Sequence, residues 1–595
     1  SLINCPWCGN RLHERNGDLA GIPTQWRLFC SRTSCMFSRK DDKSSVDNSL
    51  PVVITDEDVY SRCPSLLIAT ADKFATISWN PDCKSIFGKV ENYCKYCGYY
   101  QSSSKLKHTH PKLKNKPENY LEHRPPMSPP ELIIQDELHL ISGQLGTTFG
   151  LYETGLEYLM TNNDGIKPKI IASTATTRAS EDQILNLFNR DKTTIFPPQV
   201  ITFGDTFFSE IKTDDDSRKL YLGILATNKS GLTVQAKISA TILYNVKKLI
   251  EFGVPDEYLD PYYTLVSYYN SQKDLGGSSV SFKDSVPKFI SVVEKQSIDQ
   301  NFCDSKNPTQ PINKITLDPN LQKKLNSRYS KLFEEELTSR KPSGEIPEIL
   351  RELNQKSNET DDPVDLLLAT NMLSVGVDIP RLGVMLVNGQ PKKHSEYIQA
   401  TGRIGRVHPG LIITLYSYTK PRDISQYEEF ISYHSNFYTF VEKVSLTPFT
   451  FPSRKMALFG ILVGLMRINS NKISENKSPD KFDPEDETQK LIINQIKKLF
   501  KNRADNIDPN ESINTQNNVN ELFDEWLLYT TLHKGYLQYG ENPFENKDKT
   551  KADQFVYLLK DDLRSSNQLI SVPHSFRDAE SELNLFYEKM DVTHE

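Results

Sequence analysis

Two adjacent acidic residues, Asp136 and Glu137, have the side chains that nucleotide hydrolysis requires. They follow the apolar run 132–134 (Leu-Ile-Ile), which is typical of a strand buried on both faces of a parallel sheet. In open α/β folds, ligands bind beyond the carboxyl ends of such strands. One carboxylate could then hold hydrated Mg²⁺ while the other orients the attacking water. The alternative for an isolated Asp-Glu pair is a solvated turn.

The context of the pair favours the hydrolytic interpretation, because Asp-Glu-Leu-His at 136–139 resembles the DExH box of superfamily 2 helicases. Three further motifs of that family follow in its order: Ser173-Thr174-Ala-Thr176, then Thr370-Asn371 through Gly376-Val-Asp378, then Gln399 with Gly402-Arg403-Ile-Gly-Arg406. The resemblance implies ATP and Mg²⁺ as cofactors. It also implies nucleotide-binding and coupling roles for His139, Ser173, Thr174, Thr176, Gly376, Asp378 and Gly402.

The last motif supplies the groups that could neutralise a transferring phosphoryl group. Arginine suits this task because its planar fork is permanently charged. We expect residues 402–406 to open a helix facing the nucleotide cleft, with Gln399, Arg403 and Arg406 in catalytic positions. As an isolated Gly-Arg pattern, the same residues would be an ordinary loop.

Two of the helicase-like motifs predict contacts to a nucleic-acid backbone. Thr70-Ala-Asp-Lys73 follows the apolar run 65–69, and in the helicase family a similar turn contacts nucleic acid. The alternative is a helix-capping turn. Thr370 and Asn371 would contribute from the second domain. Five lysines within 105–116 form a basic loop that could contact phosphates or simply be solvated.

The cysteines predict zinc. Cys5 and Cys8 form a knuckle with two-residue spacing, and Cys30 and Cys35 provide a second pair, so four thiolates could close a structural site. The alternative is four reduced cysteines in a core. A second knuckle, Cys94 and Cys97, could bind another zinc with partners among Cys83, His108, His110 and His123.

The length and composition of the chain indicate a soluble multidomain protein. Its 595 residues carry a net charge of −6, so a nucleic-acid surface must be a local basic patch. The longest apolar run, 456–466, is too short to cross a bilayer, and no signal segment opens the chain. We therefore expect a cytoplasmic protein without a membrane partner.

The motifs divide the chain into tandem RecA-like, doubly wound α/β domains, of which the first is incomplete. We expect a zinc-binding module at 1–50, the first RecA-like domain at 51–210, the second at 211–425 and a mainly helical region at 426–595. Strands are predicted at 51–54, 65–69, 132–134, 168–176, 263–268, 334–340, 364–370, 383–388 and 411–418. Residues 297–319 are expected to be a mobile insert, 468–487 to be disordered, and the tail to be helical.

The amino-acid sequences around these motifs resemble those of the large helicase subunit of DISARM, a bacterial anti-phage system. It includes Leu-Ile-Ile-Gln-Asp-Glu-Leu-His-Leu-Ile-Ser-Gly at 132–143 and Ser-Leu-Thr-Pro-Phe-Thr at 445–450. The resemblance implies an ATP-driven DNA helicase or translocase that acts with other defence subunits, on single-stranded DNA or a duplex with a single-stranded end.

One motif of such an enzyme is missing. No Gly-x-x-x-x-Gly-Lys-Ser/Thr loop occurs in the sequence, so half of a nucleotide site is expected, and a truncated or split polypeptide is the simplest account. The competing hypothesis is a non-catalytic DNA-binding scaffold with a degenerate helicase fold. The sequence leaves RNA as a substrate, the translocation polarity and the partner subunits open.

Overall fold

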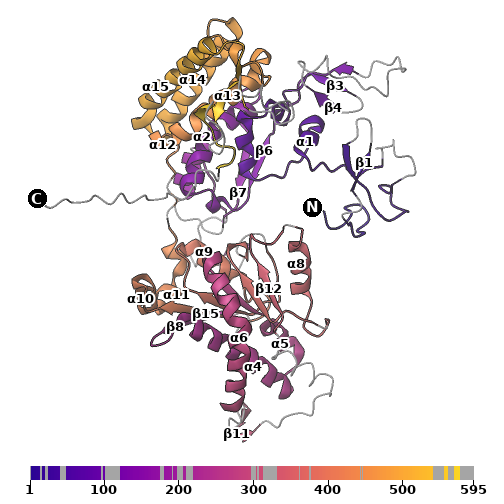
Figure 1. Ribbon diagram of the computed structural model, residues 1–595, viewed down its shortest axis with the longest axis vertical. Coiled ribbons are helices and arrows are strands. Elements are labelled where there is room, and N and C mark those ends of the chain that lie inside the picture. The colour runs from indigo at the N-terminus through magenta and orange to yellow at the C-terminus, as the bar shows by residue number, and fades with distance from the viewer. Residues whose placement is uncertain are drawn as a thin grey trace, which may run out of the picture. The chain divides into compact units, whose positions relative to one another are not determined.

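The chain folds into two compact units in a computed structural model. Unit 1 comprises residues 1–174, 179–193 and 444–595, and unit 2 comprises 175–178 and 194–443. Figure 1 shows the course of the chain through both units. The structure describes residues 2–13, 17–20, 25–39, 48–94, 98–100, 121–174, 180–190, 192–196, 206–208, 219–296, 303–304, 307–311, 332–342, 344–360, 362–373, 377–442, 444, 446–540, 555–560 and 568–576.

Unit 1 is built around one β-α-β element. Strand β6 (Leu132–Gln135) leads through helix α2 (Gly143–Met160) to the parallel strand β7 (Lys169–Ala172), with Ile134 opposite Ile171. The preceding and following elements are α1 (Asp56–Arg62), the 3-10 helices η2 (Ala71–Ser78), η3 (Pro81–Phe87) and η6 (Leu138–Leu140), and α3 (Ser180–Phe188).

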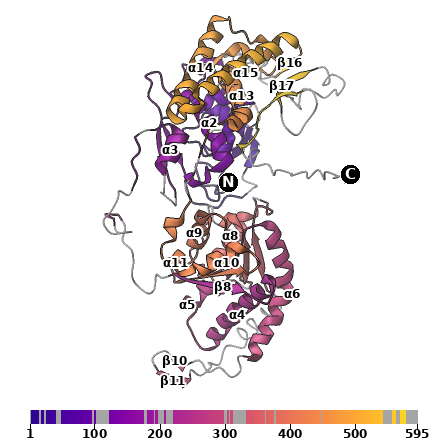
Figure 2. The same cartoon turned by 90° about the vertical axis from the view of Figure 1, so that its left-hand side faces the viewer.

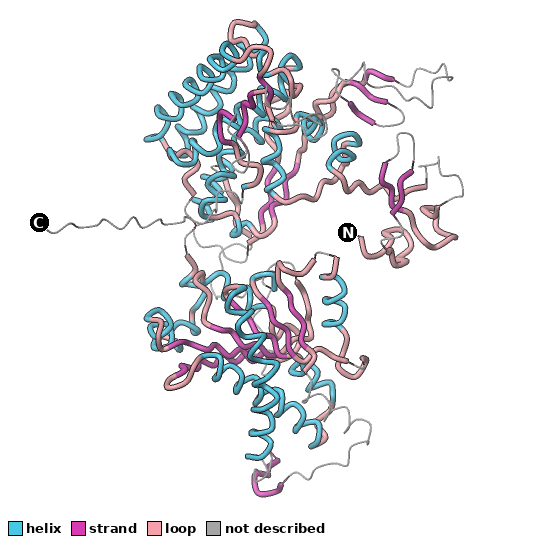
Figure 3. Tube along the Cα trace, viewed as in Figure 1, coloured by secondary structure: helices cyan, strands magenta, loops and turns pink. Residues whose placement is uncertain are grey.

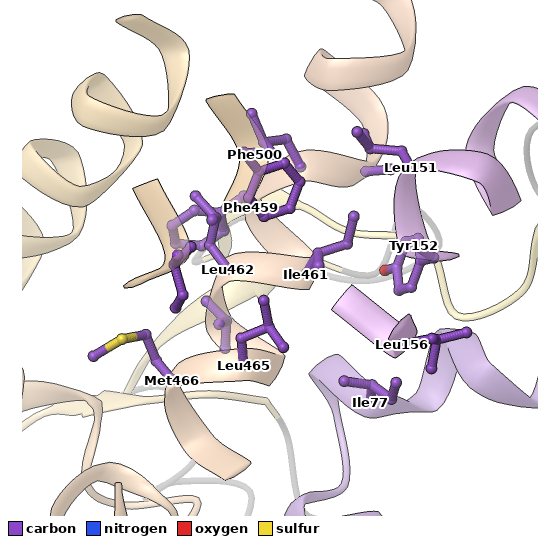
Figure 4. Packing of buried hydrophobic residues seen from close by; sticks show 14 of the residues in the cluster. Ile77, Leu151, Tyr152, Leu156, Phe459, Ile461, Leu462, Leu465, Met466 and Phe500 are labelled. Atoms are coloured by element: carbon purple, nitrogen blue, oxygen red, sulfur yellow. The ribbon is translucent and has the colours of Figure 1, made fainter. Parts of the chain in front are cut away.

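The carboxyl-terminal region packs directly on this element. It contains α12 (Phe451–Ser453), the π-helix η10 (Arg454–Leu458), α13 (Phe459–Asn469), η11 (Asn471–Ile473), η12 (Pro479–Lys481), α14 (Glu487–Ile507), η13 (Pro509–Glu511) and α15 (Ser512–Leu532). Leu151, Tyr152 and Leu156 of α2 meet Ile461 and Leu465 of α13 in a single buried cluster (Figure 4).

Glycines allow the close approach of the two regions. A Cβ atom at Gly150 would lie 2.8 Å from Cγ of Pro448, and one at Gly155 would lie 2.9 Å from Cγ2 of Ile461. Both distances are shorter than side chains tolerate. The chain segment that leaves unit 2 therefore becomes part of the core that supports β6 and β7.

Three predictions for unit 1 are wrong. Residues 51–54 and 65–69 form no strand, and residues 468–487 are ordered. The order has a physical cause: Ile473 and Phe482 are buried, and Phe482 stacks on Trp526 with ring centroids 4.3 Å apart. Two apolar anchors thus hold a segment that is otherwise polar.

The tail beyond α15 is not entirely helical as predicted. Its described part forms a parallel sheet of β16 (Leu537–Gln538), β17 (Val556–Lys560) and β18 (Gln568–Ser571). Amino-terminal to β6, short antiparallel strands occur at β1 (Gly17–Ala20), β2 (Gln25–Leu28), β3 (Asn92–Cys94), β4 (Gly98–Tyr100) and β5 (Leu121–His123).

Unit 2 has the doubly wound α/β architecture that was predicted. Six parallel strands lie in the order β12-β13-β9-β14-β15-β8, and Figure 3 shows them as one sheet. They are β8 (Lys219–Ala226), β9 (Leu265–Tyr269), β12 (Glu334–Leu337), β13 (Leu366–Ala369), β14 (Val384–Asn388) and β15 (Gly410–Ser417). All five strands predicted for this domain are confirmed, whereas β8 was not foreseen.

Helices cover both faces of the sheet in unit 2. Helices α4 (Gly231–Glu251) and α6 (Gln272–Gln296) lie side by side on one face, as Figure 2 shows, and α8 (Ile346–Asn354) and α9 (His394–Gly402) cover the other. The remaining elements are α5 (Asp256–Tyr263), η8 (Asn371–Leu373), α10 (Pro421–Glu428), α11 (Phe430–Ser435), η9 (Phe437–Phe440) and the short pair β10 (Cys303–Asp304) and β11 (Asn307–Pro311). The rest of the predicted insert, 297–319, lies outside the described residues.

No helix within the described ranges combines the length and the apolar composition that a membrane crossing requires.

Candidate functional site

The carboxyl ends of β6 and β7 bring two of the predicted motifs into contact. The Asp136 carboxylate accepts hydrogen bonds from the Glu137 backbone N–H, at 3.0 Å, and from the Ser173 hydroxyl. Backbone bonds join the same segments, since Leu138 N–H donates to the Ser173 carbonyl at 2.8 Å. Asp136 is exposed to solvent, which leaves its second oxygen accessible to a metal ion.

Glu137 adopts an uncommon backbone conformation. Its φ is +51°, in the left-handed region that non-glycine residues seldom occupy. The neighbouring His139 is buried, and its Nδ1 lies 3.4 Å from Oε2 of Glu137 and 3.4 Å from Oγ1 of Thr174. His139 therefore links the second acid of the box to the Ser-Thr motif after β7. Thr176, the last residue of that motif, lies outside the described residues.

Gln183 supports this turn, and the sequence analysis did not identify it. It lies on α3, is buried, and donates from Nε2 to the carbonyls of Leu138 and Ile141 at 3.1 and 3.0 Å. Leu138 is the first residue of the 3-10 turn that carries His139, and Ile141 directly follows that turn. The sequence alone did not indicate this supporting role for Gln183, because a glutamine in an amphipathic helix is usually solvated.

A buried charge network connects α2 to the carboxyl-terminal helices. Glu157 pairs with Lys167 at 2.8 Å, with Arg190, and with Arg503 of α14 at 3.4 Å. Burial by itself would raise the pKa of Glu157, but Arg503, Lys167 and Arg190 together hold it below its usual value. Burial raises the pKa of the neighbouring Glu153 to about 8, with only partial compensation by Arg503.

The turn predicted to contact nucleic acid is held by two other parts of unit 1. Thr70 is the exposed residue before η2, and Lys73 pairs with Asp56 at 3.0 Å on the surface. The Asp72 carboxylate accepts hydrogen bonds from Ser575 Oγ and the Phe576 backbone, at 2.7 and 2.6 Å. Thr70 and Lys73 thus remain at the surface, while Asp72 anchors the carboxyl-terminal segment.

In unit 2, the Gly-Arg motif ends a helix, so the prediction that it opens one is wrong. Helix α9 carries Gln399 and stops at Gly402, because the chain turns at Gly405, where φ is +66° and the Gly410 backbone approaches closely. Arg403 is the residue after the helix end. The turn projects Arg406, which forms an ion pair with Asp378.

The remaining residues of unit 2 lie at the carboxyl end of β13. Thr370 is buried directly after the strand, and Asn371 begins η8 with an exposed side chain. Asp378 is exposed. Gly376 lies outside the described residues.

Four cysteines come together in the amino-terminal region. The Sγ atoms of Cys5, Cys8, Cys30 and Cys35 all lie within 4.8 Å of one another. Two of the separations are 4.0 Å, between Cys5 and Cys35, and 3.6 Å, between Cys8 and Cys30. Tetrahedral zinc with bonds of about 2.3 Å requires sulfur atoms about 3.8 Å apart, so the donor set and its spacing fit zinc.

The second knuckle is only partly described. Cys94 is buried in β3, and Cys97 lies outside the described residues, as do His108, His110 and the basic loop 105–116. Among the described residues, the group at Cys5, Cys8, Cys30 and Cys35 is the one cluster with metal-ligand geometry. A second zinc therefore stays a prediction.

Comparison with known proteins supports the helicase-like motifs. The family model described as helicase conserved C-terminal domain matches residues 302–408. The chain is 36% identical over 550 residues to the DISARM protein DrmA of Bacillus paralicheniformis (strain ATCC 9945a / NCIMB 11709 / CD-2), and the match covers 91% of this chain. It covers 45% of that protein, so the chain spans somewhat less than half the length of this relative. The resemblance to helicases and to a DISARM protein is confirmed.

Solved helicase structures show more distant similarity. The DUF1998 helicase MrfA bound to DNA is 18% identical with a TM-score of 0.35, and the match covers 56% of this chain and 35% of that chain. The Mycobacterium smegmatis helicase Lhr bound to ssDNA and AMP-PNP is 12% identical with a TM-score of 0.33. The match covers 57% of this chain and 33% of that chain.

Proposed function

We propose that this chain provides the metal-binding and water-activating part of an ATP-driven DNA helicase or translocase in a DISARM-like bacterial phage-defence system. It would act in the cytoplasm together with other defence subunits. The observation that carries the proposal is the bonded arrangement of Asp136, Ser173, Glu137 and His139 at the carboxyl ends of β6 and β7. The 36% sequence identity to the DISARM protein DrmA supports the proposal of a DISARM-like defence system.

Within this proposal, the candidate site residues of unit 1 have separate roles. Asp136 would hold Mg²⁺ through its exposed carboxylate, with Ser173 fixing its orientation. Glu137 would take the proton of the attacking water. His139 and Thr174 would connect this base to the segment after β7, so that a movement of one motif would displace the other.

The residues of unit 2 would neutralise the charge that develops on the transferred phosphoryl group. Arg406 is the leading candidate, and its ion pair with Asp378 must open for it to reach a phosphate. Gln399 lies in helix α9, and Arg403 is the residue directly after that helix. Thr370 and Asn371 of this unit, and Thr70 and Lys73 of unit 1, would contact the DNA backbone.

The four-cysteine cluster would hold one structural zinc ion. Four thiolate ligands leave no coordination position for a substrate, so the metal would stabilise the fold of the amino-terminal module and take no part in hydrolysis.

A scaffold that binds DNA without hydrolysing ATP is the second candidate. The absence of a Gly-x-x-x-x-Gly-Lys-Ser/Thr loop from these residues favours it. In the first candidate, a segment outside these 595 residues supplies the loop.

Replacement of Glu137 in a longer polypeptide that includes a phosphate-binding loop, if one is encoded with this chain, separates the two candidates. Glu137→Gln should abolish DNA-stimulated ATP hydrolysis and preserve ATP binding, because the amide keeps the shape of the side chain but cannot accept the proton. Glu131→Gln, an exposed glutamate just before β6, is the matched control and should retain activity. Hydrolysis by Glu137→Gln at the normal rate would refute the assigned role, and a complete protein without hydrolysis would favour the scaffold.

A further inference from the structure

The turn that begins with Thr70 continues into the 3-10 helix η2, which has two distinct rows of side chains. In a 3-10 helix, residues three positions apart lie on the same side. Thr70 and Lys73 form an outer row and are exposed to solvent. Asp72, Ala75 and Ser78 form an inner row, in which Ala75 and Ser78 are fully buried. The acidic residue of the turn therefore lies on the side of the protein core, away from the threonine and the lysine.

A segment from the carboxyl-terminal region closes over this inner row. It comprises residues 572–576 (Val-Pro-His-Ser-Phe), which we call the strap. The Ser575 hydroxyl and the Phe576 backbone N–H both donate hydrogen bonds to Oδ1 of Asp72, at 2.7 and 2.6 Å. Hydrogen bonds to a carboxylate are about twice as strong as those between neutral groups. They fix the strap to the amino-terminal end of η2.

The strap is attached at the other end of η2 as well. Trp79, the residue directly after the helix, donates from Nε1 to the Pro573 carbonyl at 3.2 Å. Its ring stacks on His574, with the centroids 3.7 Å apart and the planes inclined by 15°. Because the strap is bonded at both ends of η2, the helix cannot turn about its own axis without breaking one of these contacts.

Phe576 anchors the strap in the core of unit 1. It is fully buried, and its ring lies against Phe149 and Tyr152 of α2, with centroids 5.6 and 4.8 Å apart. The Tyr152 hydroxyl is 3.2 Å from Oγ of Ser78 in η2. Figure 4 shows Tyr152 in the buried cluster that also contains Ile77 of η2. Helix α2 therefore supports both the strap and the helix that the strap holds.

Gly460 of α13 lies where the strap, α2 and η2 meet. A Cβ atom at this position would be 2.6 Å from Cγ1 of Val572, 2.8 Å from the Tyr152 hydroxyl and 2.9 Å from Oγ of Ser78. Side chains do not tolerate such distances, so the contact among the three segments depends on glycine. The strap is thus packed into the fold of unit 1 along its whole length.

We propose that the strap positions the turn at Thr70 and Lys73 for DNA binding by holding the Asp72 carboxylate on the inner side of η2. An aspartate that pointed outward beside Lys73 would repel a phosphate group. With Asp72 bonded to the strap, Thr70 and Lys73 are the groups presented to solvent. The proposal rests on the proposed DNA contacts of this turn, whereas the attachment of the strap to η2 does not.

The direction of one effect separates this role from simple electrostatics. Asp72→Ala removes a negative charge from the turn, and charge alone predicts tighter DNA binding. The strap predicts the opposite: binding should weaken about fivefold or more, because the cost of ordering the turn is then added to binding. Asp164→Ala also removes an exposed carboxylate from unit 1, and it is the control that should cause no weakening.

A double-mutant cycle links the strap to the lysine. Fluorescence anisotropy with single-stranded DNA is measured for the 595-residue chain with Asp72→Ala, with Lys73→Ala and with both changes. In the Lys73→Ala background, Asp72→Ala should change the affinity by less than about twofold, since the contact that it positions is already lost. A general loss of stability would instead add to the effect of Lys73→Ala.

Changes in the strap itself should reproduce the effect. Ser575→Ala removes one of the two donors to Asp72 and should weaken DNA binding about twofold or more. Ser575→Thr keeps the hydroxyl and should bind DNA as the wild type does. Both variants leave the buried Phe576 in place, which limits the risk of misfolding.

Hydrogen exchange in the absence of DNA tests the attachment separately. Exchange of residues 71–79 should become about tenfold faster in Asp72→Ala, because the charge-assisted bonds that hold η2 are lost. Exchange of α15, residues 512–532, should stay unchanged and show that unit 1 remains folded.

Three outcomes would overturn the role of the strap. They are unchanged exchange of residues 71–79 in Asp72→Ala, tighter DNA binding by this variant while Lys73→Ala weakens binding, and additive losses in the double-mutant cycle. Wild-type DNA binding by Lys73→Ala, together with faster exchange in Asp72→Ala, would instead refute the proposed DNA contact of the turn. The two proposals therefore fail in distinguishable ways.

Discussion

At the scale of residues, the chain holds its acidic pair through neighbouring side chains as well as through the strand. Ser173 fixes Asp136, His139 connects Glu137 to Thr174, and Gln183 holds the carbonyls on either side of His139. Under the proposed function such support would be needed, because catalytic groups must be kept within about 0.5 Å of their working geometry. Glu137, the second residue of the pair, has its backbone in the left-handed region.

The buried Glu153 predicts a dependence of stability on pH. Its pKa is about 8 in the folded protein against an ordinary value of 4.5, so the folded state binds a proton more tightly than the unfolded state. The resulting stabilisation is fully present below about pH 4.5 and is lost as the pH rises through about 8. Glu153→Gln mimics the protonated form and should reduce the loss of stability between these pH values.

Urea unfolding measured at several pH values from about 5 to 9 tests this dependence. Glu181→Gln, on the exposed surface of α3, is the control and should keep the wild-type slope. An identical slope for wild type and Glu153→Gln would contradict the prediction.

At the scale of elements, helix α2 couples the acidic pair to the carboxyl-terminal region. It begins at Gly143, soon after the box, and its glycines admit Pro448 and Ile461 from the segment that follows unit 2. Glu157 adds a buried ion pair to Arg503 of α14. The segment that returns from unit 2 therefore contacts the helix that starts at the site.

Gly150→Val tests the packing of α2 against the returning segment. The new side chain would begin 2.8 Å from Pro448, and we expect a destabilisation of about 1–3 kcal/mol from overpacking. The measurement is the free energy of unfolding in urea. Gly231→Ala, which meets nothing within 4 Å at the start of α4, is the control and should be nearly neutral. A stable Gly150→Val variant would mean that the two segments separate easily.

The cysteine cluster predicts one tightly bound zinc ion in the purified protein. Cys5→Ser/Cys8→Ser removes two of the four thiolates and should abolish zinc retention, because the remaining pair cannot complete the tetrahedral site. Metal analysis by mass spectrometry checks the result. Cys63→Ser changes a cysteine outside the cluster and should retain zinc. Unchanged zinc content in the double variant would rule out this ligand set.

At the scale of the whole molecule, we expect the 595-residue chain alone to bind DNA but not to hydrolyse ATP. The proposed DNA contacts at Thr70, Lys73, Thr370 and Asn371 do not require a phosphate-binding loop. Hydrolysis does require it, because the γ phosphate must be aligned for in-line attack. Binding should weaken steeply between about 50 and 200 mM salt, since phosphate contacts release counterions.

Fluorescence anisotropy with single-stranded DNA at increasing salt, together with an ATPase assay, tests this expectation. Lys73→Ala should lower the salt dependence as one phosphate contact is lost, whereas Lys490→Ala, on the exposed surface of α14, should not. DNA-stimulated hydrolysis by the chain alone would reveal a phosphate-binding element of another kind. Binding that does not respond to salt would count against the helicase interpretation.

The sequence by itself determined the features that depend on local pattern. Apolar runs placed β6, β7, β9, β13, β14 and β15, because parallel strands are rich in apolar residues. The predicted strand that contains β12 has no such run, since β12 reads Glu-Glu-Glu-Leu. Cysteine spacing identified the four residues whose sulfur atoms come together. Motif order indicated the resemblance to helicases and to a DISARM protein, which the sequence comparisons confirmed.

Only the tertiary structure decided the features that depend on distant neighbours. Residues 65–69 have a strand-like sequence but pair with no strand among the described residues, since pairing requires an adjacent strand and not just an apolar run. The polar segment 468–487 is ordered because Trp526, more than forty positions away, stacks on Phe482. Gln183 supports the acidic pair because α3 folds against the 3-10 turn. In each case the deciding contact is between residues that local periodicity cannot relate.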